Sequence, residues 1–151
     1  MLNHTIKKMS LVIVMSFFAI SANATDWTMA SGYAKSNFHT QNIMKFIDEV
    51  KSSTSVNINL NENDTLIKID AIKTALQRGQ IPIGEIRLGI YGNEDPMYIL
   101  AGLPFISPDY SSAWLLKDVQ MDYLQEKFGK KGLMILYTSP WPGQGFYTKT
   151  P

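Results

Sequence analysis

The sequence predicts an α/β fold with a mostly parallel sheet and helices on both of its faces. Apolar residues alternate with asparagines at Val56, Ile58 and Leu60, which is the period of a strand. Residues 43–50 instead place apolar side chains at helical spacing. Segments of these two kinds alternate along the chain, and such alternation favours a parallel sheet covered on both faces.

The first half of the chain is expected to contain two strands, each followed by a helix. The expected ranges are 27–30, 36–51, 56–60 and 64–79. Ser36 or Asn37 caps the first helix, because their side-chain oxygens can accept from free backbone N–H groups. Asp64 caps the second helix, and Gly79 stops it.

The second half adds two more strands and two helices. The expected ranges are a strand at 81–86, a short helix at 97–101, a helix that begins at Ser111 or Ser112 and ends before Gly129, and a strand at 133–137. The last of these is a continuous apolar run, which is typical of a strand buried on both faces. Asp95 and Asp109 are expected at turns or helix caps.

Residues 1–24 have the pattern of a secretory signal peptide. Lys7 and Lys8 precede an apolar run at 11–20, and Ala22-Asn23-Ala24 offers a small-residue cleavage site. The run is shorter than the ~20 residues of a membrane span. We therefore expect an exported protein whose mature chain begins at Thr25.

The composition excludes several kinds of site. Two of the 14 Lys and Arg residues and none of the 13 Asp and Glu residues lie in 1–24, so the remaining chain has a net charge of −1, which does not attract nucleic acid. There is no cysteine, and His39 is the only histidine after residue 24. No metal site or phosphate-binding motif is predicted, and no cofactor is expected.

Candidate ligand-binding residues follow the expected strands, because parallel α/β sheets bind ligands at the carboxyl ends of their strands. Glu85 and Arg87 lie two apart and could bind charged or hydroxyl groups of a ligand. An aromatic loop at 141–147 supplies aromatic walls and a side-chain amide, Gln144. His39 has no acid or nucleophile near it in sequence and is expected to be structural, and no catalytic residue is predicted.

Several blocks of the sequence resemble DctP-type substrate-binding proteins of TRAP transporters. These blocks are 26–33 (DWTMASGY), 37–42 (NFHTQN), 77–85 (QRGQIPIGE), 103–105 (LPF) and 141–147 (WPGQGFY). The resemblance implies a periplasmic receptor with two α/β lobes, which captures a small organic acid and delivers it to a membrane permease driven by an ion gradient. It also implies that six positions face the ligand cleft: Ser31, Tyr33, Glu85, Arg87, Trp141 and Gln144.

Two departures from the family affect these expectations. Gln144 falls where many relatives have an arginine, and an amide can hydrogen-bond a carboxylate but cannot neutralise it. The relatives are also longer and carry their main carboxylate-clamping arginine beyond the position of Pro151. Residues 25–151 are therefore expected to form the N-terminal lobe of a truncated receptor whose second lobe is absent and whose binding is impaired.

Two other readings remain open. The chain could be a small exported flavodoxin-like enzyme that uses Glu85 and His39 as acid and base, which requires the two side chains to converge. It could instead be an interaction module that docks on a permease through the aromatic loop.

Overall fold

The computed structural model describes residues 25–143 and 149. Its elements are, in chain order, β1 (Thr25–Ala30), α1 (Phe38–Ser53), β2 (Val56–Asn61), α2 (Ile72–Gln77), β3 (Ile83–Gly84), the 3₁₀ helices η1 (Leu88–Tyr91) and η2 (Pro96–Gly102), and α3 (Tyr110–Gly129). The expected signal peptide at 1–24 and the expected ligand-binding residue Gln144 lie outside the described residues.

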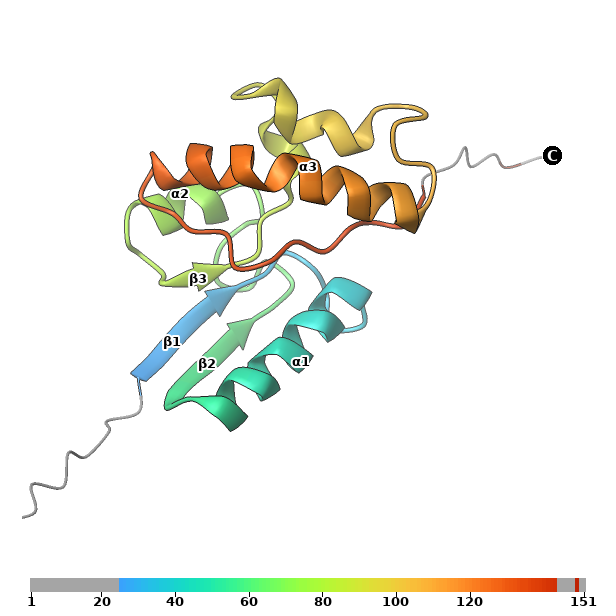
Figure 1. Ribbon diagram of the computed structural model, residues 1–151. Helices are drawn as coiled ribbons and strands as arrows, with labels where there is room; N and C mark the ends of the chain where they lie inside the picture. The colour runs from blue at the N-terminus through green and yellow to red at the C-terminus, as the bar shows by residue number, and fades with distance from the viewer. Residues whose placement is uncertain (1–24, 144–148, 150–151) are drawn as a thin grey trace, which may run out of the picture.

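The sheet has three parallel strands in the order β2-β1-β3. β1 pairs with β2 along its whole length, from Thr25 opposite Val56 to Ala30 opposite Asn61. Its other edge pairs with β3 only at Met29 and Ala30. All three carboxyl ends therefore meet at one edge of the sheet, as the expected parallel topology requires (Figure 1).

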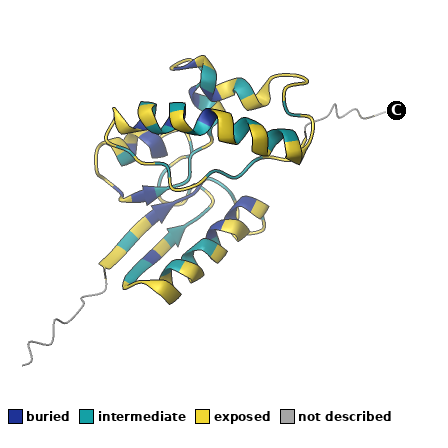
Figure 2. Cartoon of the chain, in the orientation of Figure 1, coloured by how far each residue is buried: buried dark blue, intermediate teal, exposed yellow. Residues whose placement is uncertain are grey.

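Helices cover both faces of this sheet, which confirms the predicted layering. Met29 and Ala30 are consecutive in β1, so their side chains point to opposite faces. Met29 packs in a cluster with Ile43 of α1, Ile58 and Ile83. Ala30 packs in a second cluster with Ile72 and Ala75 of α2 and with Ile81. Figure 2 shows that buried positions gather where β1 and β3 end and where α1 begins.

The helix ends agree with the sequence in part. The Asn37 side chain caps α1 by accepting from His39 N, and Gly79 follows α2 with a φ of 66°, as a glycine stop requires. The prediction that Asp64 caps the second helix was wrong, because α2 begins at Ile72. Asp64 instead accepts a hydrogen bond from Ile69 N at 2.8 Å and closes the loop before the helix.

The predicted strand at 133–137 was also wrong. This segment forms no strand in the described part of the chain, and Met134 and Leu136 are exposed. The expected strand at 81–86 is reduced to the two residues of β3, so the free edge beside it offers few backbone groups for pairing. The Gln125 side chain takes the hydrogen bonds that a neighbouring strand would have made to Ile135. It donates to Ile135 O at 2.7 Å and accepts from Ile135 N at 3.2 Å.

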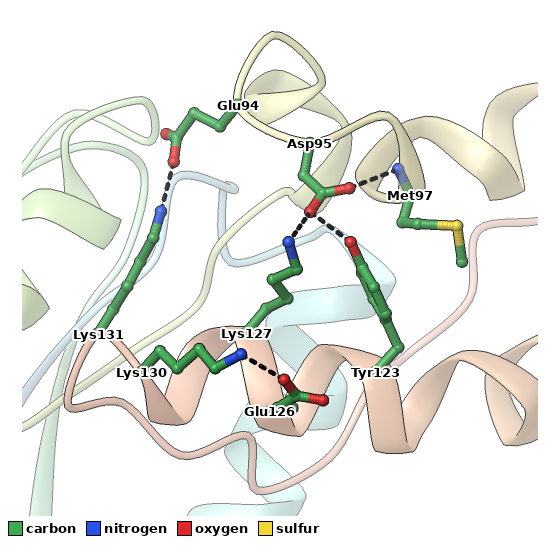
Figure 3. Close-up of polar contacts among 8 residues, drawn as sticks. All are labelled: Glu94, Asp95, Met97, Tyr123, Glu126, Lys127, Lys130 and Lys131. Carbon is green, nitrogen blue, oxygen red and sulfur yellow. Dashed lines mark hydrogen bonds and ion pairs between the residues drawn. The ribbon is translucent and has the colours of Figure 1, made fainter.

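A charged network holds α3 against η2, and Figure 3 shows it. Asp95 caps η2 by accepting from Met97 N at 3.0 Å, and its other oxygen receives Tyr123 Oη at 2.6 Å and Lys127 Nζ at 3.0 Å. Asp109 begins α3 in a reciprocal capping box with Ser112, three residues on. Within the described residues, no helix has the length and apolarity to cross a membrane.

Candidate ligand-binding site

Ser31 and Glu85 come together because they follow neighbouring parallel strands. Ser31 N donates to Asn61 O at 2.9 Å, and Glu85 N donates to Ala30 O at 2.9 Å, so both residues continue the strand pairing by one step. The fully buried Ser31 then donates a hydrogen bond from Oγ to Glu85 Oε2. The two residues therefore lie together at the edge where ligands bind such sheets.

The Glu85 carboxyl lies in a largely buried environment. Burial raises the pKa of Glu85, and the hydrogen bond from Ser31 opposes this by stabilising the ionised form. The other carboxyl oxygen, Oε1, lies 4.0 Å from His39 Nδ1. That distance is too long for a hydrogen bond but close enough for electrostatic interaction.

His39 was expected to be structural, and the structure gives it a position beside Glu85. It occupies the first turn of α1 and is buried, and burial lowers the pKa of His39. The imidazole is therefore neutral at pH 7, which follows from the direction of that shift. The sequence does contain a signal for this position. His39 lies in the first turn of the helix that follows a strand, and that turn faces the carboxyl ends of the strands.

Three hydrogen bonds position Tyr33 in the loop after β1. Its carbonyl oxygen accepts from Thr40 Oγ1 at 3.1 Å and from Asn63 N at 2.9 Å. Its N–H donates to Ser31 Oγ at 3.3 Å. The side chain is thereby held over α1, where its ring stacks on His39 with centroids 5.4 Å apart.

Trp141 completes an aromatic cluster at this position. Its indole lies edge-on to three rings, with centroid distances of 4.5 Å to His39, 5.4 Å to Tyr33 and 5.5 Å to Phe38. The indole remains 42% exposed, so it forms the outer wall of the cluster. Trp141 therefore lies against the loop after β1 and the first turn of α1.

Arg87 lies beside this cluster, and it forms no ion pair with another described residue. It is exposed and directly precedes η1. Burial raises the pKa of the Tyr33 phenol, and the positive charge of the Arg87 guanidinium opposes this rise in part. The guanidinium is thus available to an anionic ligand.

Two buried polar atoms of the site have no hydrogen-bond partner among the described residues. They are Tyr33 Oη and His39 Nε2. Within the same residues, no cluster of three or more His, Asp or Glu could hold a metal ion. A separate groove of about 510 Å³ opens between α3 and residues 136–140, and no predicted site residue lines it.

Comparison with known proteins assigns a class to this fold and site. No protein-family model matches the chain, and no curated protein matches it. Solved structures do match, and among them are extracytoplasmic solute receptors and TRAP solute-binding proteins. The chain is a periplasmic-binding-protein-like lobe related to these receptors, which confirms the resemblance to the DctP type.

Three of these structures share more than a third of their aligned residues with the chain. DctP6 of Bordetella pertussis, a receptor binding pyroglutamic acid, is 38% identical over 78% of this chain and 40% of its own, with a TM-score of 0.76. DctP7 of the same organism, also binding pyroglutamic acid, is 36% identical over 85% of this chain and 43% of its own, with a TM-score of 0.80. A marine metagenome TRAP protein specific for pyroglutamate is 35% identical with the same coverage and TM-score.

The chain spans less than half the length of these relatives, 40% to 43%. Over the part that aligns, the chain and these receptors share the fold of the lobe. What the whole receptors bind and deliver is a property of those proteins.

Proposed function

We propose that residues 25–151 form the N-terminal lobe of a TRAP solute receptor that binds a small organic acid. The observation that carries the proposal is the convergence of Ser31, Glu85 and Tyr33 at the strand ends, beside the guanidinium of Arg87, which forms no ion pair with another described residue. Receptors that are 35% to 38% identical and are described as binding pyroglutamate support a ligand with a carboxylate. In this proposal Arg87 pairs with that carboxylate, and Trp141 and Gln144 form one wall of the cleft.

The proposed ligand site is a receptor site and does not catalyse a reaction. Glu85 and His39 do converge to 4.0 Å, which is the geometry that an acid–base enzyme would need. However, the Ser31 hydroxyl donates to Glu85 and not to His39, so Ser31 and His39 do not form a nucleophile–base pair. The relatives are substrate-binding receptors, which supports the same conclusion.

The proposed location is the periplasm, with a membrane-embedded TRAP permease as partner. Residues 1–24 would direct export and would be removed before Thr25. Mass spectrometry of the mature protein tests this directly, and a retained leader would contradict it. Crosslinking to the permease subunits in membranes tests the partnership, including the alternative in which the chain serves only as a docking module.

Ligand binding is tested by NMR titration of the chain with pyroglutamate and other small carboxylates. We expect weak affinity, because a single lobe leaves the bound ligand in contact with water and electrostatic contacts are weaker there. The Arg87→Ala variant should lose binding. Arg78→Ala is the matched control, since Arg78 ends α2 away from the strand exits. Binding that survives Arg87→Ala and fails in Arg78→Ala would overturn the proposed site. Tight micromolar binding by the parent chain would contradict the expectation that one lobe alone binds weakly.

A further inference from the structure

The outer edge of β2 carries backbone groups that no described strand pairs. β2 ends the sheet order β2-β1-β3, and Figure 1 shows it at the margin of the sheet, beside α1. Ser31 N donates to Asn61 O at 2.9 Å, so Asn61 and every second residue before it direct their backbone groups towards β1. The backbone groups of Ile58 and Leu60 therefore point away from the sheet, where no strand among the described residues lies.

This edge lacks the prolines and charged residues by which natural sheets block pairing with another chain. Its sequence is Val-Asn-Ile-Asn-Leu-Asn. Beside it lies a hollow of about 210 Å³, whose apolar lining comes from Met44 and Ile47 of α1 and from Ile58 and Leu60. A strand added at this edge would place every second side chain on the side of this hollow. The edge therefore fits an extended segment in which apolar residues alternate with polar ones.

We propose that two copies of the chain associate through this edge, with β2 of one copy antiparallel to β2 of the other around a two-fold axis at Ile58. β2 itself alternates apolar residues with asparagine, so a second copy supplies the kind of segment that the edge fits. In this register Ile58 pairs with its counterpart, and Leu60 N donates to Val56 O of the second copy. Asn57 lies opposite Asn59 of the second copy, where the two side-chain amides can hydrogen-bond.

The charges at the two ends of β2 complement one another in this arrangement. Glu62 directly follows β2, and Lys51 lies in the last turn of α1, before the chain enters β2. Neither forms an ion pair with another described residue. The axis places Glu62 opposite Thr54 of the second copy, which ends α1 next to Lys51, and it does so at both ends of the interface. A parallel arrangement would instead bring Glu62 of one copy beside Glu62 of the other, so the charges favour the antiparallel one.

Sedimentation velocity of the chain over a range of concentrations tests the association, and the dimer fraction should rise with concentration. Glu62→Lys or Lys51→Glu alone should weaken the dimer about tenfold, because each change places like charges together at both ends of the interface. The double variant restores opposite charges and should recover the affinity of the parent. Lys68→Glu, at an exposed site in the loop before α2, is the control and should leave the dimer unchanged.

Leu60→Pro tests the backbone pairing. It removes an N–H that points away from β1 and leaves those that pair with β1, so it should abolish the dimer while circular dichroism still shows a folded chain. If this variant does not fold, the charge series decides. A parent chain that stays monomeric at millimolar concentration would overturn the inference, as would a dimer that neither the charge changes nor Leu60→Pro weakens. A double variant as weak as Glu62→Lys alone would overturn the antiparallel register. A monomer that binds an extended peptide with alternating apolar residues at β2 would assign the edge to another protein and overturn the dimer.

Discussion

Ser31 Oγ donates a hydrogen bond to Glu85 Oε2 across 54 residues of sequence. The bond joins the exits of β1 and β3 and holds a carboxyl group at the edge where the three strands end. Without it, the largely buried carboxyl of Glu85 would lose the hydrogen bond that favours its ionised form, and His39 Nδ1 would remain 4.0 Å from Oε1. The serine therefore determines both the orientation of Glu85 and the ease with which it ionises.

Replacing Ser31 with alanine should raise the pKa of Glu85 further, because the hydrogen bond that favours the ionised form is removed. Hydrogen bonds to charged groups contribute about 1.5–3 kcal/mol, and the free energy of unfolding should fall by roughly that amount while Glu85 is ionised. In acid, where Glu85 is protonated, the loss should be smaller. Carboxyl ¹³C NMR and urea unfolding measure both effects.

The control for this variant is Ser36→Ala, which changes an exposed serine in the loop before α1. It should alter neither the Glu85 titration nor the stability. A Ser31→Ala protein with an unchanged Glu85 pKa would show that the hydroxyl does not support the carboxylate.

Asp95 should make the stability of the chain depend on pH in acid. Hydrogen bonds from Tyr123, Met97 and Lys127 lower the pKa of Asp95 from 3.8 to about 2. The unfolded chain binds this proton more tightly, so the contribution of Asp95 is present above pH 3.8 and is lost as the pH falls towards 2. Asp95→Asn should be less stable than the parent at pH 6, and the difference should shrink near pH 2.

Urea unfolding of both proteins from pH 2 to pH 6 gives the comparison, and the difference between the curves isolates Asp95 from the other carboxyls. Asp122→Asn is the control, since Asp122 is exposed on α3. A constant difference across the whole range would contradict the assigned titration.

The sequence predicted the parts of this fold that depend on local pattern. The alternation at 56–60 and the helical spacing at 43–50 each reflect one buried face, and both elements are present as β2 and α1. The predicted parallel order of the strands also explains why Ser31 and Glu85 meet, because residues that follow parallel strands lie at the same edge of the sheet. Local pattern alone therefore located the edge of the sheet that carries the candidate site.

The failures have a different physical origin. The apolar run at 133–137 has the composition of a strand, but pairing depends on a neighbouring edge that two-residue β3 does not provide. Asp64 can cap a helix, but its carboxylate accepts from Ile69 N in the loop before α2 and not from an N–H of the helix itself. The position of His39 beside Glu85 depends on how α1 packs, which a single residue in the sequence does not reveal.

The segment after α3 should depend on one side chain. The Gln125 amide satisfies both backbone groups of Ile135. Gln125→Ala should speed hydrogen exchange at the Ile135 N–H about fivefold, since a hydrogen bond of roughly 1 kcal/mol is lost and the segment opens more often. Gln125→Glu keeps an acceptor for Ile135 N and should have the smaller effect. Exchange at Ile135 that is the same in Gln125→Ala as in the exposed-site control Gln80→Ala would refute this dependence.

Trp141 should determine the pKa of His39. Burial lowers the pKa of His39 below 6.5, and the indole of Trp141 is one of the groups that bury it, with ring centroids 4.5 Å apart. Trp141→Ala should expose the imidazole and return its pKa towards 6.5. Because the folded pKa is the lower one, burial of His39 costs stability as the pH falls through 6.5, and this dependence should weaken in the variant. NMR titration of the imidazole measures the shift, and Trp114→Ala, at the half-exposed tryptophan of α3, is the matched control. An unchanged His39 pKa in Trp141→Ala would show that the indole does not shield the imidazole from water.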